Sequence, residues 1–503
     1  MSTVHPTNEL SESPYAVFRM FGAVGRDAVP VLLAATFLLA IWWIASAITG
    51  DAALASYVSV AAVLGGYMAL NIGANDVANN VAAAVGSKAL TLAGAVVIAV
   101  VFETAGALLA GGDVVSTIRK GIVDPGAIAD TLSFIRAMCA ALLAAALWLN
   151  LATFCGAPVS TTHAIVGGVV GAGIVAGGVG AVNWGVMSKI AASWVISPVL
   201  GGIIAAGFLM LLNKTVLSKP DVLSASRRWV PILVAVLAAA FTVYMAMKGL
   251  KKIWKPDAMT IMASGAVAFG LTVLIVRPLV VRASAKLENR RKSVNTLFNI
   301  PLVCAAALLS FAHGANDVAN AVGPLAAIVA AAASGTIDSK VGIPVWIMLV
   351  GAIGIAIGLA LFGAKLIRTV GNKLTSLDQA RAFCCVLSAA ITVIAASALA
   401  LPVSSTHIAI GAVFGVGFYR EFRNNVAAKA RDRARRAGAL RAPDVQPVRP
   451  GLMYLERAPL IRRRKLVRRN HFLTIIAAWF ITVPSAGALA GLLFYLSKTF
   501  LPG

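Results

Sequence analysis

The sequence predicts an all-α polytopic membrane protein with about 12–13 transmembrane segments, built as two inverted-topology repeats with broken or re-entrant helices. First, 59% of its 503 residues are apolar and only 12% are charged, whereas a soluble domain carries about 25% charged residues. Second, its apolar runs are far longer than the strands of a membrane barrel, so helices must cross the bilayer. Third, two polar motifs inside these runs each occur twice.

Apolar segments follow one another along the whole chain. The first, Val29–Ile48, is long enough to span the bilayer and lacks a small-residue cleavage signature, so we expect a retained helix and not a removed signal peptide. The five cysteines lie in apolar segments without a framework spacing, which indicates small buried hydrophobes, not disulfides. In order, the segments lie at about 29–48, 54–83, 88–110, 132–154, 158–176, 186–213, 229–247, 259–281, 297–334, 344–366, 380–401, 403–420 and 471–497.

The net charge of +24 is concentrated between the apolar segments. Positive charge in such loops is a topology signal and a contact for anionic lipid heads, so we expect no nucleic-acid partner. The basic loops Arg282–Lys292 and Arg420–Arg469 are both expected to be cytoplasmic, which is consistent with the four segments between them. Lys248 and Lys255 conflict with this count, because they fall in a loop that it places outside.

One heptapeptide is spelled identically in both halves, as Gly73–Asn79 and as Gly314–Asn320. A second motif, Pro158–His163, recurs as Pro402–His407 with one change, from threonine to serine. The copies keep the same order, while the loop charges give the two halves opposite starting sides. This combination predicts an inverted repeat, the plan of many secondary transporters.

The inverted repeat divides the chain into units. We expect a cytoplasmic tail (1–28), an extra N-terminal transmembrane helix (29–53), repeat 1 (54–213), linking helices with a basic cytoplasmic loop (214–296), the first part of repeat 2 (297–419), a basic cytoplasmic loop (420–470) and the last transmembrane helix of repeat 2 (471–503).

The heptapeptides place a carboxylate at membrane depth, where an ionisable residue indicates a functional site. The glycine of each motif would permit an unwound turn that frees backbone carbonyls. Carboxylate, amide and carbonyl oxygens suit Na⁺ or a transported proton. An alternative is that Asn and Asp only hold helices together. The predicted cation-coupling residues are Asp76, Asp317, Asn79, Asn320 and Glu103, the last a further acid inside an apolar run.

The second motif is typical of a helix start after a break. Proline suits a first helical turn and hydroxyl residues suit the cap. Exposed N–H groups at such a start attract an anion, and arginine and lysine are almost absent from the neighbouring apolar interiors. The predicted substrate-binding residues are Ser160, Thr161, Thr162, Ser404, Ser405, Thr406, Asn75 and Asn316.

The histidines of the second motif, His163 and His407, are either packing donors or contacts for substrate or protons. His313 aligns with Ile72 and therefore favours packing. A Ser-His nucleophile is a poor interpretation, because no carboxylate or elbow motif lies nearby. We therefore expect no enzyme, no cofactor and no metal beyond a transported Na⁺.

Both pairs of motifs, in their order and number, resemble the inorganic phosphate transporter (PiT) family, over about 54–213 and 297–497. The resemblance implies that Asp76 and Asp317 are essential for transport and that Glu103 is the family's acid after the first motif. It also implies a homodimer in which phosphate binds between the two halves of each protomer. The chain departs from the family in one helix, Ala382–Leu401, which has no acidic residue.

From the residues and the resemblance together, we expect a multi-pass transporter of the plasma membrane that imports inorganic phosphate with Na⁺ or H⁺ by alternating access. The alternatives within transport are a sulfate or a metal–phosphate symporter. An anion channel and an intramembrane enzyme are alternatives from other classes.

Overall fold

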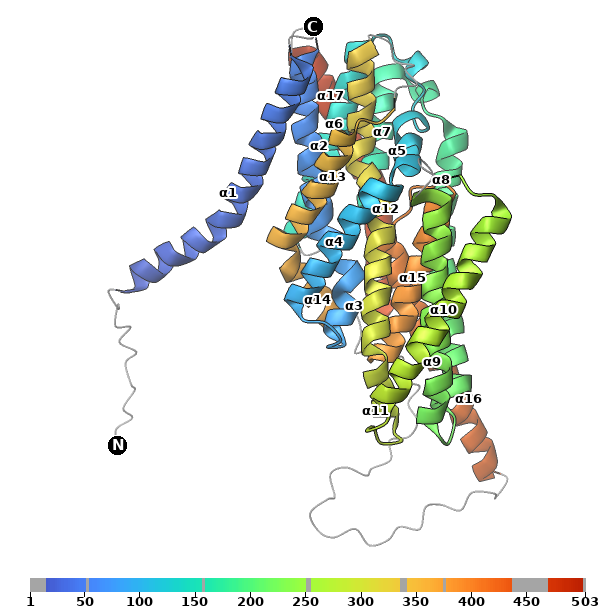
Figure 1. Cartoon of the computed structure of the whole chain (residues 1–503). Helices are drawn as coiled ribbons and strands as arrows, with labels where there is room; N and C mark the ends of the chain where they lie inside the picture. The colour runs from blue at the N-terminus through green and yellow to red at the C-terminus, as the bar shows by residue number, and fades with distance from the viewer. Residues whose placement is uncertain are drawn as a thin grey trace, which may run out of the picture.

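The computed structural model describes residues 15–50, 54–155, 159–249, 255–334, 342–373, 377–436 and 469–500. In these ranges the regular elements are helices, with one isolated β-bridge between Val123 and Val182. The helices form one bundle, from which the N-terminal part of the first helix points away (Figure 1). The helices of the first half are α1 Tyr15–Thr49, α2 Ala55–Asn75, α3 Ala78–Gly86, α4 Leu92–Ala110, α5 Gly112–Lys120, η1 Pro125–Ala127, α6 Thr131–Phe154, α7 Thr161–Gly177, η2 Val179–Ala181, α8 Trp184–Leu212 and η3 Asn213–Leu217.

The remaining helices link the halves and build the second one. They are α9 Val222–Tyr244, η4 Met245–Gly249, α10 Ala258–Ser284, α11 Arg291–Leu297, α12 Asn299–Ser334, α13 Val345–Gly358, η5 Leu359–Gly363, α14 Ala364–Lys373, α15 Gln379–Ala398, α16 Ser405–Arg436 and α17 Arg469–Phe500. Of the basic loop predicted at 420–470, the part up to Arg436 continues α16, and 437–468 lie outside the described residues.

Eleven helices of the described residues are long and apolar enough to cross a membrane. This confirms the all-α polytopic fold class. The two predicted segments at 158–176 and 403–420 are not among the eleven: α7 has only 17 residues, and α16 does not qualify. Both helices begin at the second motif inside the protein, so each has a shorter apolar length than a helix that starts at the membrane surface.

The two basic regions predicted to share one side lie at the same end of the bundle, where α11 and the C-terminal end of α16 are found (Figure 1). Lys248, which conflicted with the predicted topology, forms an ion pair with Asp113 at 2.5 Å. Its charge is therefore neutralised within the protein and is a weaker topology signal than a free loop lysine. Lys251 and Lys252 lie outside the described residues.

Several helices begin at polar caps, whose side chains accept hydrogen bonds from the first backbone N–H groups. Asp130 caps α6 by accepting hydrogen bonds from the backbone N–H and the hydroxyl of Ser133, each at 2.7 Å. These hydrogen bonds hold the pKa of the Asp130 carboxyl below its ordinary value, because they stabilise its charged form. The break that sequence predicts before the second copy of the second motif is confirmed, since α15 ends at Ala398 and α16 begins at Ser405.

The heptapeptide helix of each half packs against a helix of the other half. Helix α2 crosses α13, and α12 crosses α4. A Cβ added to Gly73 would lie 2.0 Å from the carbonyl oxygen of Ile355, and one added to Gly314 would lie 2.1 Å from that of Glu103. Only glycine permits such close approach of two backbones. The two heptapeptides are therefore held in place by equivalent helix crossings, each made with a helix of the other half.

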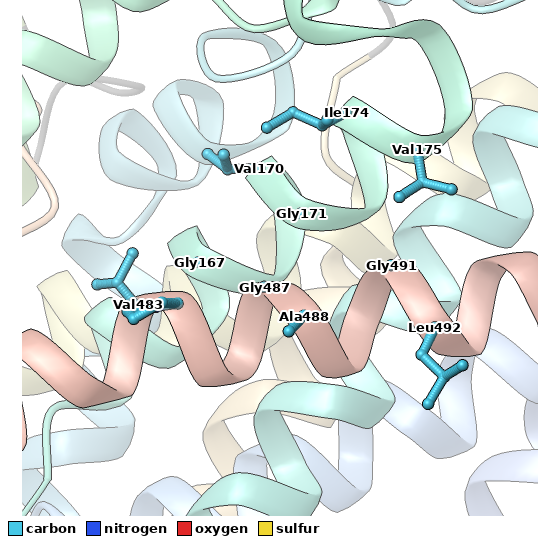
Figure 2. Close-up of a pocket in the computed structure, with 11 residues that line it drawn as sticks. Gly167, Val170, Gly171, Ile174, Val175, Val483, Gly487, Ala488, Gly491 and Leu492 are labelled. Carbon is cyan, nitrogen blue, oxygen red and sulfur yellow. The ribbon is translucent and has the colours of Figure 1, made fainter.

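The second motif follows the same rule. Helix α7 packs against α17, and α16 packs against α8. A Cβ at Gly171 would lie 2.1 Å from the carbonyl oxygen of Gly487, and one at Gly415 would lie 2.0 Å from that of Gly202. Figure 2 shows the glycine faces of α7 and α17 against each other, beside an apolar groove of about 410 Å³. Each half thus supplies the support for the motif helices of the other.

Candidate functional site

The two aspartates of the heptapeptides meet in the interior of the bundle. Asp76 lies directly after α2 and Asp317 lies within α12, and both side chains are fully buried. The Thr161 hydroxyl lies 2.8 Å from Asp76 Oδ2 and 3.2 Å from Asp317 Oδ2. A single hydroxyl at the start of α7 therefore joins the aspartates of both halves.

The last asparagine of each heptapeptide reaches the second motif of the opposite half. Asn79 Nδ2 donates to Thr406 Oγ1 at 2.7 Å, and the Thr406 hydroxyl in turn donates to Asp76. Asn320 Nδ2 donates to Thr161 Oγ1 at 3.1 Å. The amides, carboxylates and hydroxyls predicted as separate cation and substrate groups are thus one hydrogen-bonded cluster in this structure.

The first asparagine of each heptapeptide supports the chain that precedes the second motif of its own half. Asn75 Nδ2 donates to Thr153 Oγ1 at 2.8 Å, near the end of α6. Asn316 Nδ2 donates to Ser397 Oγ at 2.9 Å, and Asn316 Oδ1 accepts from the backbone N–H of Val403 at 3.2 Å. Both residues hydrogen-bond to helix ends in this structure, and their contact with substrate stays a prediction.

Two of the six predicted hydroxyl residues are helix caps. Ser160 Oγ accepts from the backbone N–H of His163 at 3.2 Å, and Ser404 Oγ accepts from that of His407 at 3.3 Å. The predicted cap is therefore confirmed in both copies. The proline is not in the first helical turn: Pro402 precedes the cap in a non-helical stretch, where its missing N–H leaves no unsatisfied donor. Pro158 lies outside the described residues.

The other two hydroxyls of the second motif also have partners. Thr162 Oγ1 donates to the carbonyl oxygen of Val403 at 2.9 Å, and Ser405 Oγ donates to Asp317 Oδ2 at 3.4 Å. The first turns of α7 and α16 therefore converge on the same pair of aspartates. Two helix N-termini that face one buried point create a region of positive potential there.

His313 lies between the acidic groups, whereas its alignment with Ile72 favours packing. Its Nδ1 is hydrogen-bonded to Glu103 Oε2 at 2.7 Å, and its Nε2 lies 3.2 Å from Asp317 Oδ2 and 4.0 Å from Asp76 Oδ2. Asn80 Nδ2 donates to the other oxygen of Glu103 at 2.7 Å. One imidazole therefore lies within 4.0 Å of the carboxylates of Asp76, Glu103 and Asp317. Glu103 is part of the cluster, and its role in cation coupling stays a prediction.

The histidines of the second motif lie next to each other. The ring centroids of His163 and His407 are 4.6 Å apart, and the ring of Trp194 lies 3.8 Å from that of His163. His163 Nδ1 is buried without a hydrogen-bond partner among the described residues. Ring packing is what this geometry supplies, and contact with substrate stays a prediction for both.

The unwound turn expected in the heptapeptides is not present. The first copy has a short interruption at Asp76–Val77, where both residues keep right-handed helical dihedral angles. The second copy runs through α12 without a break. The glycines of the motif have another role, because Gly73 and Gly314 are the points of closest helix crossing.

The cluster is closed to solvent. Every side chain that contacts the two aspartates is at least 90% buried. Ligand atoms of Asp76, His313 and Asp317 lie within 4.8 Å of one another, an arrangement able to hold a cation. Movement of the surrounding helices is needed before an ion or a solute from either side reaches this point.

Comparison with known proteins places the chain among transporters. The model of the phosphate transporter family matches residues 72–490. The chain belongs to this family. A Helicobacter pylori (strain J99) protein provisionally named a phosphate permease is 46% identical over 507 residues, which cover 93% of this chain and 95% of that protein. A Pyrococcus horikoshii protein with the same provisional name is 38% identical over 432 residues, which cover 86% of this chain and 95% of that protein.

The fold has a counterpart of known structure. A solved structure described as the sodium-dependent phosphate transporter aligns with a TM-score of 0.76 and 33% identity, and the alignment covers 89% of this chain and 100% of that chain. The resemblance seen in the motifs is therefore confirmed over most of the sequence. As a member of the phosphate transporter family, the chain is a multi-pass membrane transporter and not an enzyme.

Proposed function

We propose that this phosphate transporter family member imports inorganic phosphate together with Na⁺ or H⁺ by alternating access between two inverted repeats. The observation that carries the proposal is the position of Asp76, which accepts hydrogen bonds from Thr161 of the first half and Thr406 of the second. The likeness to a sodium-dependent phosphate transporter favours Na⁺. The equivalent crossings of α2 with α13 and of α12 with α4 support the two-repeat plan.

The cluster suggests how cation and phosphate binding are linked. Thr161 and Thr406 donate to Asp76 in this structure. A cation that binds the carboxylates takes up the oxygens to which these hydroxyls donate, so the hydroxyls become available to phosphate. Each ligand then raises the affinity for the other, as linkage requires. Phosphate without a cation would face two unscreened carboxylates.

Charge balance makes coupling necessary. Each elementary charge that crosses about 100 mV corresponds to about 2.3 kcal/mol. Importing a divalent anion against an inside-negative potential therefore requires about 4.6 kcal/mol per 100 mV. Two co-transported cations cancel this requirement, and a third cation, or a monovalent form of phosphate, makes import favourable. The three carboxylates Asp76, Glu103 and Asp317 offer places for these cations.

The test is phosphate uptake into proteoliposomes under an imposed Na⁺ gradient or an imposed pH gradient, applied separately. We expect Asp76→Asn and Asp317→Asn each to abolish uptake, because each removes a carboxylate charge with almost no change of shape. Asp257→Asn is the matched control, since Asp257 is an exposed cap of α10 and asparagine also caps. Normal uptake by both site variants would refute the assignment.

A metal–phosphate complex is the second candidate, favoured by the mixed ligand set of Asp76, His313 and Asp317. Imidazole with carboxylate is typical of transition-metal sites rather than of Na⁺ sites. Uptake of labelled phosphate that stops when a chelator is added, with Na⁺ still present, would support this candidate. Competition by sulfate and current without a cation gradient test the sulfate and channel alternatives.

A further inference from the structure

The chain between α15 and α16 contains a non-helical segment, Ala400–Val403, whose four consecutive carbonyl oxygens each accept a hydrogen bond from a side chain. The donors and distances are Thr117 Oγ1 to Ala400 at 2.8 Å, Asn316 Nδ2 to Leu401 at 3.1 Å, Trp194 Nε1 to Pro402 at 3.3 Å, and Thr162 Oγ1 to Val403 at 2.9 Å. Non-helical backbone at membrane depth needs such partners, because lipid supplies none.

Three of the four donors come from the other half of the molecule. The non-helical segment belongs to the second half, whereas Thr117, Thr162 and Trp194 lie on α5, α7 and α8 of the first. Only Asn316 shares a half with the segment. Any movement of one half relative to the other therefore has to break or rearrange three of these hydrogen bonds.

The backbone of the segment is also held in a conformation that its own sequence disfavours. Ala400 has a φ of +55°, in the left-handed region. An L-residue in this region is disfavoured, because its Cβ comes too close to the backbone. Such a conformation persists only where surrounding contacts fix it. The contacts at this point are two backbone hydrogen bonds at the end of α15, from Ala400 N–H to the Ser397 carbonyl oxygen and from Leu401 N–H to the Ala396 carbonyl oxygen, each at 3.0 Å, together with the Thr117 hydroxyl.

The segment leads directly into the substrate cluster. Ser404 follows it as the cap of α16, and the next two residues, Ser405 and Thr406, contact Asp317 and Asp76. A shift of the segment therefore shifts the first turn of α16. Trp194 has a second contact at the cluster, because its ring lies against His163 at the start of α7.

We propose that Thr117 and Trp194 are positioning residues that hold the non-helical segment, and with it Ser405 and Thr406, in the closed arrangement around bound phosphate. Their hydrogen bonds form when the halves close and are lost when either side opens. The inference rests on the proposed phosphate transport. It adds two residues that contact neither aspartate among the described interactions.

The test uses the full-length transporter in proteoliposomes with labelled inorganic phosphate. Thr117→Val removes the hydroxyl and keeps the shape, and Trp194→Phe removes the indole N–H and keeps an aromatic ring against His163. We expect each variant to raise the KM for phosphate about three- to tenfold, the factor that corresponds to one lost hydrogen bond. The maximal rate per folded transporter stays within about twofold, because the cluster itself is intact.

Matched controls separate this effect from a structural one. Thr215→Val removes a hydrogen bond from a hydroxyl to the carbonyl oxygen of Leu211, and Trp184→Phe removes one from an indole N–H to the carbonyl oxygen of Val179. Both hydrogen bonds lie away from the non-helical segment. We expect both to keep the wild-type KM. A purely structural role of Thr117 and Trp194 would lower the amount of active protein without a change in KM.

The outcomes are distinguishable. A KM that is unchanged or lower in both Thr117→Val and Trp194→Phe overturns the inference, whatever happens to the maximal rate. If one variant does not fold, the other decides, and the thermal shift caused by phosphate in detergent gives its affinity independently of transport. Absence of uptake by the wild-type protein would instead count against the proposed function.

Discussion

The two halves of the molecule surround identical heptapeptides with different chemistry. The helix crossings show which positions correspond: a Cβ added at Gly73 would lie 2.0 Å from the carbonyl oxygen of Ile355, and one added at Gly314 would lie 2.1 Å from that of Glu103. Glu103 therefore corresponds to Ile355. The repeat offset likewise pairs His313 with Ile72 and Asn80 with Ala321.

All three members of the polar chain Asn80–Glu103–His313 thus have apolar counterparts in the other half. The backbone plan is shared, because close helix crossings require glycine in both halves. Of the ionisable groups in the cluster, the aspartates Asp76 and Asp317 are shared by the two halves, whereas Glu103 and His313 each have an apolar counterpart. The comparison teaches that the repeat builds the scaffold and the pair of aspartates, and that departures from the repeat add the buried acid and its imidazole partner.

The largest expected effect comes from copying the apolar residue of one half into the other at the centre of the cluster. We expect His313→Ile to abolish phosphate uptake and to destabilise the protein by about 3–5 kcal/mol, because it leaves the buried Glu103 carboxylate without its partner. Uptake and thermal unfolding in detergent measure the two effects. Ile72→Val, at the equivalent position, is the control and should cost about 0.5–1.5 kcal/mol.

An intermediate effect is expected when the whole polar chain is converted to its counterpart. The triple variant Asn80→Ala, Glu103→Ile and His313→Ile removes the unpaired groups together, and such replacement of a buried ion pair is often neutral. We expect it to unfold at a higher temperature than His313→Ile alone and still not to transport. A triple variant that is no more stable than the single one would show that the network is not the source of the loss.

The smallest effect should be equal in the two halves. Gly73→Ala and Gly314→Ala each place a methyl group about 2 Å from a backbone oxygen of the facing helix. We expect each to destabilise the protein by about 1–3 kcal/mol, as overpacking does. Gly207→Ala is the control, because a Cβ there meets nothing within 4 Å. Clearly unequal losses at the two motif glycines would contradict a shared scaffold.

Much of the fold and part of the site could be predicted from the sequence. Apolar run lengths predict the membrane-spanning helices, and the repeated motifs predict that Asp76 and Asp317 lie together. Glu103 was predicted from its position inside an apolar run. These features are local or repeated, so a single sequence carries their signal.

What could not be predicted depends on contacts between distant parts of the chain. His313 was assigned to packing because it aligns with Ile72, yet that same mismatch was the available signal of its role. Its partner Glu103 lies on another helix, 210 residues away in sequence. The heptapeptide glycines were read as a local break, whereas their function is set by the helices that cross them.

The packing of α7 of the first half against α17 of the second has a consequence for how the chain is made. Helix α7 leaves the ribosome long before α17, the partner of its glycine face. Until α17 enters the bilayer, Gly167 and Gly171 lack the protein surface against which they pack. This part of the core is therefore completed only after α17 has been made, and a translation product that stops before Arg469 leaves the glycine face of α7 uncovered.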